Sequence, residues 1–176
     1  MKYLAFLSLT ILMSCTASKP TVNPITNNEG DLEGIITTEN LKEAPHKQWY
    51  LEHYNEYEVD QNTLTQLSAV PNWKQNTQII IYLGTWCEDS HLQVPHLVKI
   101  FDELEYYSFT LIALDKNKTS KNKIEEGDNI KFVPTIVVKQ NRSEIGRIVE
   151  APIESLEKDL VKILLREEYT PNYYNE

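Results

Sequence analysis

The chain is short of cysteine, glycine and positive charge. Only two of its 176 residues are cysteines and five are glycines, so at most one disulfide can form within it. Asp and Glu outnumber Lys and Arg by 26 to 17, which gives a formal net charge of -9. Without an excess of basic residues to neutralise phosphates, no nucleic-acid partner is expected. The hydrophobic share of 41% is ordinary for a globular protein, and the length suits one domain with appendages.

No hydrophobic run is long enough to span a bilayer as a helix, which takes roughly 20 residues. The apolar stretch 4–13 follows Lys2 and instead predicts a signal peptide over residues 1–14. It ends at Cys15 in the sequence LMSC, which resembles the lipobox of bacterial lipoproteins. That resemblance implies that Cys15 is lipidated and anchors the exported chain to a membrane of the bacterial cell envelope. A plain secretory signal with an incidental cysteine is the alternative, and both place the chain where disulfides persist.

Composition divides the rest of the chain into four parts. Residues 15–34 are polar and rich in Pro, Asn and Gly, which predicts a flexible linker behind the lipid anchor. Residues 35–75 have a helical pattern and form a predicted N-terminal helical extension, and residues 76–167 form the main domain. The last residues, 168–176, are predicted to be a flexible tail.

Within the helical extension, Pro45 is typical of a first helical residue and Asp60 of an N-cap. Tyr50, Tyr54 and Tyr57 recur at helical spacing along the first of these two predicted helices. Such a stripe is either a binding surface or, more commonly, packing against a sheet edge. The sequence leaves both interpretations open and favours packing.

The main domain combines the periodicities of strands and helices, which predicts an α/β fold. Strands are predicted at 78–83, 108–114, 135–139 and 144–149, and helices at 88–105 and from Pro152 onward. The last two strands surround a polar turn and so predict an antiparallel hairpin.

Cys87 lies where the first buried strand of the main domain gives way to its first helix. Backbone N–H groups at a helix N-terminus carry partial positive charge and favour the thiolate, the reactive form of cysteine. Glu88 and Asp89 oppose that ionisation, whereas His91, if protonated, favours it, and the sequence does not decide between them. With Cys15 carrying lipid, Cys87 has no partner within the chain. An unpaired thiol in an oxidising compartment indicates a reactive group.

The order of these elements around the motif WCEDS, residues 86–90, resembles the thioredoxin family. Further support comes from Pro95 in the helix after the cysteine, from the motif VPT at 133–135 before the hairpin, and from the closing helix. The resemblance implies an α/β, thioredoxin-like three-layer fold, in which a central mixed sheet is flanked by helices.

The same resemblance implies roles for individual residues. Thioredoxins have a cis proline facing the active sulfur, and the family's second cysteine is replaced here by a serine whose hydroxyl is expected to hydrogen-bond the sulfur. The implied catalytic residues are Cys87, Ser90 and Pro134, and the implied substrate-binding residues are Trp86, Val133 and Thr135. A further departure from the family is Ile81, which stands where thioredoxins carry a buried acid.

Dithiol turnover needs a second thiol to expel the substrate from the mixed disulfide. With Ser90 in that place, the sequence predicts a monothiol thiol–disulfide exchange protein whose mixed disulfides are resolved by an external thiol. The expected partners are thiol- or disulfide-containing envelope proteins or small thiols, and no cofactor is expected. A metal site of Cys87, His91 and His96 is not expected, because zinc-ligand spacing is absent. The alternative is a redox-inactive module that uses the same fold for binding or scaffolding.

Overall fold

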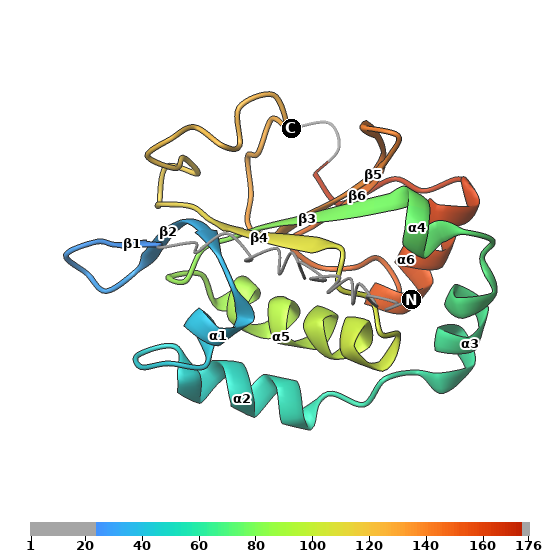
Figure 1. Ribbon diagram of the computed structural model, residues 1–176, viewed down its shortest axis with the longest axis horizontal. Helices are drawn as coiled ribbons and strands as arrows, with labels where there is room; N and C mark the ends of the chain where they lie inside the picture. Colours follow the sequence, from blue (N-terminus) through green and yellow to red (C-terminus); the bar gives the residue numbers. More distant parts are fainter. Residues whose placement is uncertain (1–23, 174–176) are drawn as a thin grey trace, which may run out of the picture.

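Runs of branched apolar residues form the centre of a six-stranded sheet. Its strands are β1 (Ile25–Thr26), β2 (Leu32–Ile36), β3 (Thr77–Leu83), β4 (Phe109–Ala113), β5 (Thr135–Gln140) and β6 (Ser143–Val149). The structure, a computed structural model, describes residues 24–173 (Figure 1). The strand order is β1-β2-β4-β3-β5-β6, with β3 and β4 parallel and every other neighbouring pair antiparallel. The sheet is therefore mixed.

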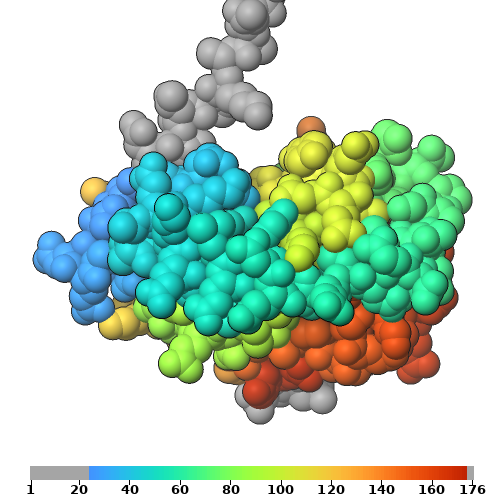
Figure 2. Space-filling model, turned by 90° about the horizontal axis from the view of Figure 1, so that it is seen from below, coloured from blue at the N-terminus to red at the C-terminus, as the bar shows by residue number. Residues whose placement is uncertain are grey.

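Helices cover one face of this sheet in two tiers. They are α1 (Thr38–Leu41), α2 (Lys47–Glu56), α3 (Gln61–Ala69), α4 (Trp73–Asn76), α5 (Glu88–Glu103) and α6 (Leu156–Leu165). The apolar side chains of α5 and α6 pack on the sheet, while α2 packs on α5 and α3 packs on α6. Seen from this side, α2 forms much of the outer surface (Figure 2). The predicted α/β fold, a mixed sheet flanked by helices, is confirmed.

The opposite face of the sheet is covered by the segment 115–132, which is drawn above the sheet in Figure 1. Ile124 and Ile130 from this segment pack against the buried side chains of that face. Asp128 fixes the segment, because its carboxylate accepts a hydrogen bond from the Tyr82 hydroxyl at 2.6 Å and another from the Lys139 ammonium at 2.6 Å. This segment is therefore held as a layer of its own, and it leads directly into β5.

The prediction of a flexible linker over residues 15–34 is wrong for residues 24–34, the part that the structure describes. These residues contain β1 and the start of β2. Leu32 is 7% exposed, and β2 pairs with β4 inside the sheet. The polar residues that suggested a linker form a turn, in which the Asn27 side-chain oxygen accepts two backbone N–H groups. The predicted signal peptide, 1–14, and Cys15 lie outside the described residues.

The described part of the predicted flexible tail, 168–176, is also packed. The Tyr169 hydroxyl donates a hydrogen bond to Asp159 of α6 at 2.9 Å, and the Asn172 amide donates one to the Ala151 carbonyl at 2.9 Å. Burial and the neighbouring Asp159 carboxylate raise the pKa of Tyr169. The tail therefore continues the fold beyond α6 instead of fraying.

Capping side chains fix the first turns of α3 and α6. Asp60 caps α3 as predicted, because its side chain accepts the backbone N–H groups of the first turn. The helices α2 and α6 begin after Pro45 and Pro152, not at these prolines as predicted. For α6 the reason is Ser155, whose hydroxyl accepts the N–H of Lys158 at 3.3 Å and so fixes the first turn.

The tyrosine stripe of α2 packs against α5. Tyr50 is 1% exposed, and the Tyr54 hydroxyl donates a hydrogen bond to Asp102 at 2.8 Å. The ring of Tyr57 stacks on His96, with 4.1 Å between ring centroids. Packing, the favoured interpretation of the stripe, is therefore correct, but the partner is a helix and not a sheet edge.

His96 makes the contact between α2 and α5 sensitive to pH. Burial, with smaller contributions from His53 and Lys99, lowers the pKa of His96 from 6.5 to about 4. Between these two values the unfolded chain binds more protons than the folded chain. The contribution of His96 to the free energy of unfolding is therefore lost as the pH falls from about 6.5 to about 4.

Replacing His96 with phenylalanine keeps a ring against Tyr57 and removes the titrating group. The free energy of unfolding, measured by urea denaturation at several pH values, is expected to fall less steeply between pH 7 and pH 4 than in the wild type. The slope does not vanish, because burial also lowers the pKa of His46. An unchanged slope would show that His96 binds its proton as easily in the folded chain as in the unfolded one.

Candidate active site

Cys87 lies at the N-terminus of α5, as predicted. It is the N-cap residue and has an extended backbone, with φ -102° and ψ 123°, so the free N–H groups of the first helical turn lie beside it. Its thiol is free and partly exposed. Glu88 and Asp89 of the first turn are exposed, so a partner that approaches the sulfur meets two carboxylates.

The sulfur faces the segment that starts β5. Cys87 Sγ lies 3.1 Å from the Val133 carbonyl oxygen, to which the thiol donates a hydrogen bond. The Val133–Pro134 bond is cis, as predicted, and the Pro134 carbonyl accepts the N–H of Glu150 at 2.8 Å. The fold thus brings Cys87 and Pro134 together from two separate segments. Because a carbonyl oxygen only accepts, the bond to Val133 belongs to the protonated thiol and breaks when Cys87 ionises.

Ser90 connects α5 to the end of β3. It is 0% exposed, and its hydroxyl oxygen accepts the N–H of Gly84 at 3.1 Å. The hydrogen bonds of residues 24–173 do not include the predicted one from Ser90 to Cys87 Sγ. The serine oxygen instead accepts the N–H of Gly84, which follows the last residue of β3, and this contact joins the start of α5 to the end of that strand. Ile81, in the place of the family's buried acid, is completely buried in the same strand.

Trp86 forms one wall beside the sulfur. Its ring is half-buried, and Nε1 donates a hydrogen bond to the Leu114 carbonyl at 2.9 Å. The indole lies so close to the backbone of Gly84 that a Cβ there would be 2.6 Å from Trp86 Cε2. Lys118 Nζ lies over the ring, 5.6 Å from its centroid. Trp86 is therefore held in a fixed orientation with part of its surface exposed.

Thr135 is placed beneath the site. Its side chain is 1% exposed, and its hydroxyl donates a hydrogen bond to the Phe132 carbonyl at 2.8 Å. This bond spans the residues on either side of the Val133–Pro134 peptide. Because the Thr135 backbone also lies between β3 and β6, opposite Tyr82 and Val149, the predicted role of Thr135 in substrate binding stays a prediction.

His91 is held on the other side of the motif. Its ring stacks on Trp49 of α2, with centroids 4.2 Å apart, and its Nε2 donates to the Thr85 carbonyl at 2.7 Å. The Thr85 hydroxyl in turn donates to Asp31 at 3.3 Å and accepts the N–H of Leu32 at 3.0 Å. Sequence reasoning missed Asp31, Thr85 and Trp49, because their partners are distant in the chain.

Comparisons with known proteins identify relatives of this chain. A model of a family described as Thioredoxin matches residues 34–169 of the chain, so the match includes the helices α1 to α4 as well as the main domain. Mitochondrial thioredoxin-3 from Saccharomyces cerevisiae is 28% identical over 99 residues, which cover 55% of this chain and 75% of that protein.

Two solved structures are similar to the fold. A protein of unknown function from Pseudomonas aeruginosa has a TM-score of 0.52 and 12% identity, and the match covers 70% of this chain and 84% of that one. An HIV epitope-scaffold has a TM-score of 0.50 and 12% identity over 70% of this chain and 77% of its own. At this identity, both structures support the fold alone.

Proposed function

Because the chain belongs to the thioredoxin family, we propose that it performs thiol–disulfide exchange with Cys87 as its single nucleophile. Thiol–disulfide redox chemistry is the general function of the family. One observation carries the monothiol proposal. A partly exposed Cys87 at a helix N-terminus faces the cis peptide at Pro134, while the position one helical turn on holds Ser90, fully buried and bonded to the backbone.

The proposed reaction has two steps. Cys87 gives its proton to solvent and attacks one sulfur of a partner's disulfide, so that a Cys87–partner S–S bond forms and the partner's own S–S bond breaks. The departing sulfur leaves as a thiolate and takes up a proton. Ser90 has no sulfur for a second attack, so an external thiol attacks the partner's sulfur, an S–S bond forms between that thiol and the partner, and Cys87 leaves as a thiolate that can take up the proton of the external thiol. The net reaction exchanges one thiol for another and needs no further oxidant or reductant.

Substrate docking follows from the same contacts. When Cys87 ionises, the Val133 carbonyl loses the hydrogen of the thiol. That oxygen can then accept a hydrogen bond from the backbone of an extended peptide laid beside Pro134, in the manner of an added strand. The exposed part of Trp86 supplies an apolar surface for the same peptide. Activation of the sulfur and binding of the substrate are thereby linked.

The proposed setting is the bacterial cell envelope. It is supported by the sequence of residues 1–15, in which Cys15 would carry the lipid that holds the protein at the membrane. The partners proposed are thiol- or disulfide-containing envelope proteins or small thiols. Within residues 24–173, no helix is both long and apolar enough to cross a bilayer.

Reaction with an aromatic disulfide, 5,5′-dithiobis(2-nitrobenzoate), tests the proposal. Cys87 is expected to form a mixed disulfide several-fold faster than N-acetylcysteine at pH 6, where an ordinary thiol is almost fully protonated. The adduct at Cys87, found by mass spectrometry, is expected to persist until an external thiol is added. Cys87→Ala should lose this adduct, and Cys15→Ser should keep it. A rate no faster than that of N-acetylcysteine would contradict the proposal.

The alternative, a redox-inactive binding module, is favoured by one observation. The Cys87 thiol donates a 3.1 Å hydrogen bond to the Val133 carbonyl, a contact that only the neutral S–H can make. If this hydrogen bond outweighs the effect of the helix N-terminus, iodoacetamide should alkylate Cys87 no faster than a free thiol at any pH. Capture of envelope proteins should then be the same for the wild type and for Cys87→Ala, because no covalent bond would be involved.

A further inference from the structure

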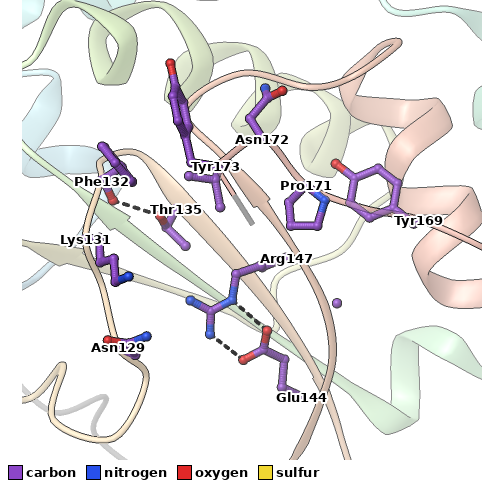
Figure 3. A pocket seen from close by; sticks show the side chains of 12 residues that line it. Asn129, Lys131, Phe132, Thr135, Glu144, Arg147, Tyr169, Pro171, Asn172 and Tyr173 are labelled. Carbon is purple, nitrogen blue, oxygen red and sulfur yellow. Dashed lines mark hydrogen bonds and ion pairs between the residues drawn. The ribbon is translucent and has the colours of Figure 1, made fainter. Parts of the chain in front are cut away.

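A pocket of about 290 Å³ lies beside the segment that carries Pro134 (Figure 3). Three parts of the chain line it: residues 129–132, the β5–β6 hairpin and the tail residues 169–173. Its volume is at the lower end of the range of about 300–1,000 Å³ that is usual for small-molecule sites. The pocket therefore suits a small molecule and not an extended peptide.

Aromatic side chains form the upper wall of this pocket. Phe132 and Tyr173 stack with 4.7 Å between ring centroids and 27° between planes. Pro171 and Tyr169 continue the wall, and the hydrogen bonds of the tail to Asp159 and Ala151 hold it in place. Rigid aromatic and proline surfaces favour a flat, apolar body.

Arg147 supplies hydrogen-bond donors to the same pocket. Its Nε donates to Glu144 at 2.7 Å, and its Nη2 donates to Glu144 at 2.6 Å and to the Asp128 carbonyl at 3.0 Å. An arginine has five N–H donors. Among the described residues, the two on Nη1 have no protein acceptor, and Figure 3 shows this atom pointing away from Glu144, toward the side of Lys131. These donors fit the oxygens of a carboxylate.

We infer that this pocket binds a small molecule with an aromatic body and one carboxylate. The body lies against Phe132 and Pro171, and one oxygen of the carboxylate accepts a hydrogen bond from Nη1 of Arg147. Lys131 also lines the pocket and adds positive charge. The bidentate pair with Glu144 holds the guanidinium in a fixed orientation, so little freedom is lost when the ligand binds.

Occupancy of the pocket also affects the thiol, a part of the inference that rests on the proposed function. Phe132 and Thr135 line the pocket and are joined by a 2.8 Å hydrogen bond across the cis peptide. Between them lies Val133, whose carbonyl accepts the hydrogen bond from Cys87. A ligand that moves Phe132 or restricts its motion therefore also affects the position or mobility of the Val133 carbonyl oxygen, which accepts the hydrogen bond from the Cys87 thiol. By linkage, ionisation of Cys87 or formation of its mixed disulfide changes the affinity of the pocket for the ligand.

Three probes with the same ring test the binding: phenylacetate, its neutral isostere phenylacetamide, and the cation phenethylamine. Each is titrated into the full chain while the backbone amides of Thr135, Arg147 and Tyr173 are followed by NMR. Phenylacetate is expected to shift these amides saturably and to bind about three- to tenfold more tightly than phenylacetamide, because charge-assisted hydrogen bonds are the stronger ones. Phenethylamine should bind more weakly than both. No saturable shift with any probe, or equal affinity for all three, overturns the inference.

Two variants with opposite expected effects on phenylacetate binding test the role of Arg147. Glu144→Gln removes the competing negative charge but keeps a side-chain oxygen that, with the Asp128 carbonyl, still orients the guanidinium, so the affinity for phenylacetate should rise about threefold. Arg147→Gln should abolish the preference for phenylacetate over phenylacetamide. Arg142→Gln, at an exposed arginine in the hairpin turn, is the charge control and should leave the preference unchanged. If Arg147→Gln fails to fold, Glu144→Gln still decides, because an unchanged or lower affinity there overturns the role of Arg147.

The effect on the thiol is measured separately, as the rate of Cys87 alkylation by iodoacetamide with and without saturating phenylacetate. A change of at least about twofold is expected. A constant rate at full occupancy overturns the link and leaves the binding site standing. An inert Cys87 contradicts the proposed function, which the NMR titration does not test.

Discussion

Ser90→Cys is expected to convert a protein that holds its mixed disulfide into one that releases it. Position 90 lies one helical turn after Cys87, so a thiol there stays within reach of the mixed disulfide. An attached thiol has an effective concentration of at least about a millimolar. The lifetime of the adduct should therefore fall about a thousandfold relative to its lifetime in a micromolar solution of external thiol. The released protein would carry a disulfide between Cys87 and the introduced cysteine.

Mass spectrometry after reaction with 5,5′-dithiobis(2-nitrobenzoate), in a Cys15→Ser background, distinguishes the outcomes. Ser90→Cys should retain no nitrobenzoate, whereas Ser68→Cys, with a second thiol on the exposed side of α3, should retain a label on each cysteine. The change costs about 1 kcal/mol of stability, because sulfur is a poor acceptor for the Gly84 N–H that Ser90 now accepts. A stable adduct at Cys87 in Ser90→Cys would mean that the two positions cannot meet.

The central elements of the fold could be predicted because their signals are local. β3, β4 and β5 are continuous apolar runs, and α6 repeats its apolar residues at helical spacing. The β1–β2 hairpin gave no such signal. Its strands are short, most of its side chains are exposed or half-buried, and it is held by an asparagine turn and by pairing with β4. Polar composition alone therefore suggested a linker where the structure has strands.

The candidate site also combines features that the sequence predicts with contacts that it does not predict. The position of Cys87 and the cis peptide at Pro134 follow from short motifs, so the sequence was sufficient for them. The contact between Thr85 and Asp31 joins residues 54 positions apart, and no local sequence pattern predicts it. The hydrogen bond of Ser90 to Gly84 depends on where β3 ends, so the motif alone does not predict it.

Asp159 is expected to be among the most sensitive positions for stability. It is 0% exposed, and its carboxylate accepts the N–H of Ile153 at 2.6 Å, the N–H of Glu154 at 3.2 Å and the Tyr169 hydroxyl at 2.9 Å. Asp159→Ala leaves all three donors without their acceptor. Breaking such a buried, charged network costs about 3–5 kcal/mol of the free energy of unfolding, measured by urea denaturation.

Two further variants show which contact causes the loss of stability in Asp159→Ala. Tyr169→Phe removes only the bond from the tail and should cost about 1 kcal/mol, whereas Glu154→Ala removes an exposed carboxylate and should cost much less than Asp159→Ala. The NMR signal of the Asn172 side-chain amide, which donates to the Ala151 carbonyl, should shift in Asp159→Ala and Tyr169→Phe but not in Glu154→Ala, because only the first two release the tail. Equal stability of Asp159→Ala and Glu154→Ala would mean that the buried carboxylate does not hold the tail to α6. The aromatic wall of the pocket would then have to be fixed by the Asn172–Ala151 hydrogen bond and by the stacking of Phe132 on Tyr173.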